Sequence, residues 1–71
     1  MSSNDLLVNL GMRIKAVRIT KKMTQNELAA KCKLEKTGIS RIEAGLTNPT
    51  VKTLHKISKT LEVHIAELFK D

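Results

Sequence analysis

The chain has almost no aromatic residues, since it contains no tryptophan, no tyrosine and a single phenylalanine among 71 residues. Proline and glycine are also scarce, with one and three residues. A core must therefore be aliphatic, and the shortage of turn-forming residues disfavours a protein of many strands and tight turns. The composition favours a few short helices around one small core.

Only one cysteine is present, Cys32, so an internal disulfide is excluded and nothing requires an oxidising compartment. No apolar run approaches the roughly 20 residues of a membrane-spanning helix, and the segment MSSND lacks the features of a secretory signal. We therefore expect a cytoplasmic protein that does not bind membranes.

The residue patterns of catalytic and ligand sites are missing as well. His55 and His64 have no partners at metal-ligand spacing, and no paired acids, phosphate-binding glycine loop or cofactor motif is present. We expect a protein that is not an enzyme and uses no metal, cofactor or small-molecule ligand. Cys32 is expected to be a small buried side chain, and His64 to cap the last helix.

Acidic residues are outnumbered, because thirteen lysines and arginines against seven aspartates and glutamates give a net charge of +6. The pI of about 9.8 exceeds the value of about 9 that often marks nucleic-acid-binding domains. Residues 1–23 hold five basic residues against one acidic residue, whereas 24–49 and 50–71 each hold four against three. The charge favours a nucleic-acid partner without identifying one.

Apolar spacing predicts a first helix over about Asp5 to Lys21, and its start is marked by four good N-cap residues, Ser2, Ser3, Asn4 and Asp5. Its stripe consists of Leu7, Leu10, Ile14 and Val17. Thr24 and Glu27 have the spacing of a capping box, which starts a second helix.

A short third helix is expected over about Lys36 to Ala44, before Gly45. After a loop, Thr50 caps a fourth helix, and a last helical turn or two covers Ile65 to Phe69. The fourth helix has a predicted buried stripe of Val51, Leu54, Ile57 and Leu61. The sequence thus predicts an all-α fold, a compact five-helix bundle forming one domain over residues 1–71.

Two short helices separated by a break of three or four residues have the layout of a helix-turn-helix, here about residues 24–45. The second of these helices has few apolar positions, so core burial alone does not explain it. Its exposed polar groups suit the DNA major groove. They belong to Lys36, Thr37, Ser40 and Arg41.

The sequence resembles the lambdoid phage repressor and Cro-like helix-turn-helix family over most of its length. The resemblance is carried by MTQNELAAKCKLEKTGISRIEAGLTNPT at 23–50, by LHKISKTLEV and by AELF. It implies a lambda repressor-like DNA-binding domain whose second and third helices contact double-stranded DNA. It further implies a sequence-specific transcriptional regulator, most often a repressor, that binds a palindromic operator as a homodimer.

For base contacts, the resemblance implies Lys36 and Thr37 at the start of the third helix, with Ser40 and Arg41 on the same exposed face. Arginine at such a position commonly binds O6 and N7 of guanine, and a good bidentate contact contributes about 1 to 3 kcal/mol of discrimination. Lys36 alternatively contacts only a phosphate, because its ammonium group is a flexible point charge. For each of these four residues, the alternative to a base contact is a solvated side chain on a surface helix.

For contacts to the DNA backbone, the resemblance implies the start of the second helix, where Thr24 and Gln25 precede amides that point at a phosphate. Thr47 and Asn48 match loop positions that contact the backbone or a groove edge, with ordinary turn residues as the alternative. Lys33 is a further candidate, because it stands where the family commonly has glycine. A plain polar residue is the alternative for Gln25.

Arg18 and Glu43 match a salt bridge that in several family members joins the first helix to the end of the third. We assign this pair a structural role. Lys22, Lys33 and Glu62 replace common glycines at helix ends, and each costs about 1 to 2 kcal/mol if its site requires positive φ.

Gly38 within the third helix costs about 1 kcal/mol relative to alanine. Close approach to DNA and packing against the second helix explain it equally well. Glu35 occupies the capping position of the same helix, where its carboxylate can interact with the helix dipole.

Two other functions are compatible with the sequence: an antitoxin-like module that binds a toxin protein and its own promoter, and a nonspecific nucleoid protein. One helix-turn-helix contacts only half an operator, so dimerisation is expected. Candidates for the dimer interface, with core packing as the alternative for each, are Leu6, Leu61, Ile65 and Phe69.

Overall fold

The computed structural model describes residues 3–70, with side chains from Asp5 onwards. Its elements are α1 (Ser3–Thr20), α2 (Gln25–Cys32), α3 (Lys36–Glu43), α4 (Val51–Leu61) and the 3-10 helix η1 (Ile65–Phe69). The all-α class is confirmed for this part of the chain, in which no strand occurs. The expected five-helix bundle is corrected to four α-helices and a 3-10 turn, since five residues are too few for a stable α-helix.

The helix boundaries lie close to those predicted. α1 ends at Thr20, one residue before the predicted Lys21, because Lys22 adopts a positive φ of 59° and the chain turns there. α3 ends at Glu43, and Ala44 is its C-cap. Of the four N-cap candidates, Ser2 to Asn4 lie outside the residues whose side chains are described, and Asp5 lies in the first turn of α1.

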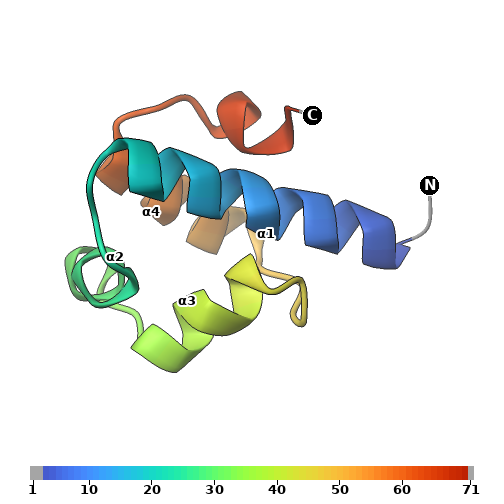
Figure 1. Ribbon diagram of the computed structural model, residues 1–71, viewed down its shortest axis with the longest axis horizontal. Helices are drawn as coiled ribbons and strands as arrows, with labels where there is room; N and C mark the ends of the chain where they lie inside the picture. Colours follow the sequence, from blue (N-terminus) through green and yellow to red (C-terminus); the bar gives the residue numbers. More distant parts are fainter. Residues whose placement is uncertain (1–2, 71) are drawn as a thin grey trace.

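α1 crosses the middle of the molecule, with α2 and α3 on one side and η1 on the opposite side (Figure 1). α4 packs against α2 and η1, and α3 packs against both α1 and α2. The core between these elements consists of Leu10, Ile14, Val17, Leu28, Ala29, Cys32, Ile39, Ile42, Leu54, Ile57, Leu61 and Leu68. No described helix is long and apolar enough to cross a membrane.

One apolar residue differs from its predicted environment. Val51 is 75% exposed because it is the first residue of α4, one turn before Leu54 reaches the core. Phe69 is half exposed, and the neighbouring Leu68 occupies the core position in η1. The single aromatic residue therefore contributes little to the core.

The capping box that was predicted at the start of α2 is present. The Thr24 hydroxyl accepts from the Glu27 amide at 3.0 Å, and the Thr24 amide donates to Oε1 of Glu27 at 3.0 Å. The hydrogen bond from the Thr24 amide, and after it the interaction with the Thr24 side chain, hold the pKa of the Glu27 carboxyl group below its ordinary value. Glu35 and His64 occupy the N-cap positions of α3 and η1, as predicted, although neither side chain makes a capping hydrogen bond.

The three helix ends that lack the common glycine still adopt the left-handed conformation. The φ angles of Lys22, Lys33 and Glu62 are 59°, 57° and 59°. After Lys33, the Leu34 amide donates to the Ala29 carbonyl, and after Glu62, the Val63 amide donates to the Ser58 carbonyl. Each lysine or glutamate is thus held in a conformation that glycine would adopt at lower cost.

Candidate nucleic-acid interface

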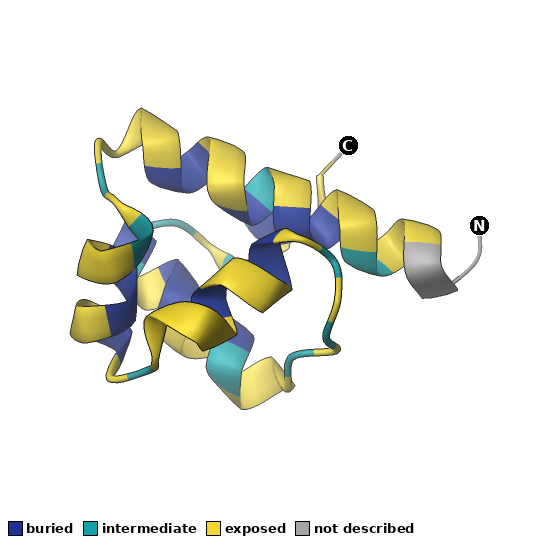
Figure 2. Cartoon of the chain, turned by 60° about the horizontal axis from the view of Figure 1, so that its bottom comes forward, coloured by how far each residue is buried: buried dark blue, intermediate teal, exposed yellow. Residues whose placement is uncertain are grey.

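α3 offers a polar face that its own fold does not cover. Ile39, Ile42 and Glu43 are its buried residues, and the opposite side of the helix is exposed (Figure 2). The exposed residues include the four predicted base contacts Lys36, Thr37, Ser40 and Arg41. An exposed helix of this polarity has the dimensions and hydrogen-bonding groups that fit a major groove.

The predicted backbone contacts lie around this helix, on three separate segments. Thr24 is exposed at the N-terminus of α2, and Lys33 is exposed at its C-terminus. Asn48 is exposed and Thr47 partly buried in the loop that follows α3. Gln25 is partly buried, and its Nε2 donates to Oε1 of Glu43 at 3.0 Å. Sequence reasoning missed this last contact.

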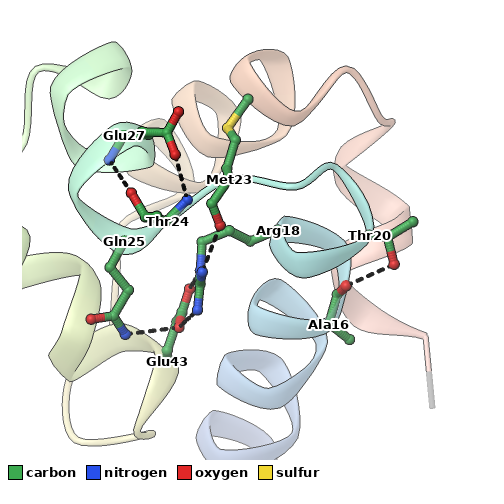
Figure 3. A network of polar contacts seen from close by, with 8 residues as sticks. All are labelled: Ala16, Arg18, Thr20, Met23, Thr24, Gln25, Glu27 and Glu43. Atoms are coloured by element: carbon green, nitrogen blue, oxygen red, sulfur yellow. Dashed lines mark hydrogen bonds and ion pairs between the residues drawn. The ribbon is translucent and has the colours of Figure 1, made fainter.

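Arg18 and Glu43 form the predicted ion pair, which joins α1 to the last residue of α3 (Figure 3). Nε of Arg18 donates to Oε2 of Glu43 at 2.6 Å, and Nη2 donates to Oε1 at 3.0 Å. The remaining Nη1 donates to the Met23 carbonyl at 2.7 Å. The two side chains are 9% and 3% exposed. The pair is therefore bidentate and almost completely desolvated.

This network fixes the position of α3. The hydrogen bonds with Glu43 hold the pKa of Arg18 above its ordinary value, against the opposite effect of its burial. The same Glu43 carboxylate accepts from Gln25 in α2, so one buried acid joins three helices. Because Glu43 ends α3, any shift of that helix relative to α1 or α2 breaks bonds in a buried site.

Gly11 in α1 allows the end of α3 to lie directly against α1, which sequence reasoning also missed. A Cβ atom at this position would lie 2.4 Å from the Ile42 carbonyl oxygen and 2.5 Å from that of Glu43. Gly45, after α3, has φ +74° and lies against Val8. A glycine inside a helical stripe was the only signal in the sequence for the first contact.

The four candidates for the dimer interface lie in different environments. Leu61 has no exposed surface and belongs to the core, which confirms its place in the predicted buried stripe and excludes it from an interface. Ile65 is partly buried and packs against the core. Leu6 and Phe69 are about half exposed, on α1 and η1.

The HTH_3 helix-turn-helix family matches residues 14–68, which contain α2, α3 and the network that joins them to α1. The chain belongs to this family. The resemblance inferred from the sequence is thereby confirmed, and the protein is a DNA-binding transcriptional regulator.

This HTH_3 regulator is similar to two control proteins over most of their length. It is 36% identical over 67 residues to control protein C.BamHI of Bacillus amyloliquefaciens, covering 93% of this chain and 83% of that protein. It is 36% identical over 69 residues to control protein C.MunI of Mycoplasma sp, covering 96% and 93%. Among solved structures, the wild-type restriction-modification controller protein C.Esp1396I superposes with a TM-score of 0.82 at 44% identity, covering 90% and 84%.

Proposed function

We propose that the protein regulates restriction-modification genes by binding a palindromic operator as a homodimer. The observation that carries the proposal is the exposed polar face of α3, held in place by a desolvated ion pair. The restriction-modification controller protein C.Esp1396I, which is 44% identical and is covered at 84% of its length, supports the restriction-modification setting. The names of the two control proteins do not describe antitoxins, which favours the regulator over the antitoxin-like alternative.

In this proposal α3 lies in the major groove and Arg41 is the main determinant of sequence. Thr37 and Arg41 are four residues apart on the exposed side of the helix, so both point at the groove floor together. Lys36 and Ser40, also four residues apart, lie together on one flank of that pair and contact base edges or phosphates. A guanidinium fork on guanine O6 and N7 supplies more discrimination than the ammonium of Lys36.

The sugar-phosphate backbone is bound by groups on both sides of α3. At the positive end of the α2 dipole, the amides of Gln25 and Asn26 point at a phosphate, since the capping box uses only those of Thr24 and Glu27. Lys33 contacts a phosphate beside the start of α3, and Thr47 and Asn48 do so beyond its end. A second copy occupies the other half-site through an apolar surface that contains Leu6, Ile65 and Phe69.

Selection of bound duplexes from a random library, with purified protein, tests this function. We expect an inverted repeat with half-sites about 10 bp apart, centre to centre. Arg41→Ala should lose preference at one base pair in each half-site, whereas Lys59→Ala, on the exposed surface of α4, should retain the full motif. Recovery of unrelated sequences with a steep salt dependence would instead indicate nonspecific binding.

Lys33 and Glu62 provide a matched test of the backbone contacts, because they have nearly identical left-handed geometry at the ends of α2 and α4. Lys33→Gly and Glu62→Gly should each relieve about 1 to 2 kcal/mol of strain and raise the melting temperature. Only Lys33→Gly should weaken operator binding and reduce the slope of log K against log salt by about one. If both variants bind DNA like the wild type, Lys33 is not a phosphate contact.

A further inference from the structure

The three glycines of the chain differ in what explains them. Gly11 is required by the contact of α1 with the α3 carbonyls, and Gly45 by its φ of +74° and its contact with Val8. Gly38 has neither reason, because a Cβ at this position would meet nothing within 4 Å and its φ is not positive. Packing against α2, one of the two explanations open at the level of sequence, is therefore excluded.

Gly38 nevertheless lies within a helix, where glycine is disfavoured. It is exposed within the first turn of α3, beside Thr37 and three residues before Arg41. Glycine destabilises a helix interior relative to alanine, so the isolated protein would be more stable with a side chain here. The folded chain itself offers no compensating contact.

We propose that Gly38 is a specificity-determining position, at which the main chain of α3 lies directly against the edges of bases in the major groove. The inference rests on the proposed function and adds one residue to its interface. Gly38 has no side chain, and nothing else fills the space next to Thr37 and Arg41. The helix can therefore approach the groove floor more closely there than a β-carbon would permit. A methyl group would hold the first turn away and lengthen the contacts of both neighbours.

Gly38→Ala tests the proposal, because it should change stability and operator binding in opposite directions. We expect a melting temperature higher by about 4 to 8 °C and an operator Kd at least tenfold larger. Binding to unrelated duplex should change little, and the salt slope should be retained, since no phosphate contact is removed. Ala16→Gly, at an exposed position in α1, is the control: it should lower the melting temperature and leave operator Kd unchanged.

Unchanged or tighter operator binding by Gly38→Ala would overturn the proposal, as would an equal loss on operator and unrelated DNA. A double-mutant cycle with Arg41→Ala separates direct contact from an effect on Arg41, whose side chain leans over the preceding turn. If the Gly38→Ala loss disappears in the Arg41→Ala background, Gly38 does not meet the DNA itself. If the wild-type protein selects no sequence from the library, the proposed function fails, whatever Gly38→Ala does to stability.

Discussion

Gly11→Ala is expected to lower the melting temperature by about 10 °C or more, although alanine is the better helix former. The new Cβ would lie within 2.7 Å of three backbone atoms of Ile42 and Glu43. Overpacking of this kind costs about 1 to 3 kcal/mol where side chains can move, and more where the obstacle is a carbonyl group. Since α1 and α3 are both regular helices, the whole of α3 must move away.

The displacement of α3 gives this variant a second effect. Gly11 lies against the backbone of Glu43, whose side chain binds Arg18, so moving α3 lengthens the bonds of the buried pair. Operator affinity should therefore fall even at temperatures where the variant remains folded. Thermal melting and DNA titration of Gly11→Ala and Gly38→Ala together provide the check. A Gly11→Ala variant as stable as the wild type would contradict the close packing of α1 on α3.

Local features of the sequence predicted most of the fold. The capping box of Thr24 and Glu27 involves residues three apart, so it was visible without tertiary structure. The stripes of α1 and α4 likewise follow from helical spacing. Spacing does not say which residue at the end of a stripe is covered. For that reason Val51 was expected inside, and Leu61 was both a residue of the buried stripe and an interface candidate.

Contacts between distant segments were predicted only where a resemblance supplied them. Arg18 and Glu43 are 25 residues apart, and their pairing came from the family pattern. Gln25 and Gly11 had no such guide. The amide of Gln25 meets Glu43 only because α2 and α3 pack side by side, and the need for Gly11 arises only when α3 touches α1. The DNA contacts themselves stay predictions.

Glu43→Gln is expected to destabilise the protein by about 3 to 5 kcal/mol, because it leaves a desolvated guanidinium without a counter-charge. A chain of 71 residues has a free energy of unfolding of only about 4 to 11 kcal/mol, so this loss is a large part of the total. The glutamine amide has the size of the carboxylate that it replaces. If its nitrogen takes the place of Oε1, its N–H groups face the N–H donors of Arg18 and Gln25. Operator affinity should fall as well, since α3 loses its fixed end.

The second Arg–Glu pair of the chain is the matched control. Nη2 of Arg13 lies 3.6 Å from Oε2 of Glu67, which also pairs with Nζ of Lys70 at 3.0 Å. The Arg13 and Glu67 side chains are 33% and 34% exposed, so Glu67→Gln should cost less than about 1 kcal/mol. High salt should weaken the exposed pair while affecting the buried one little. Urea unfolding of both variants at low and high salt measures the difference. Similar small losses would mean that Arg18 finds another partner or water, and that burial of the Glu43 carboxylate does not determine the position of the recognition helix.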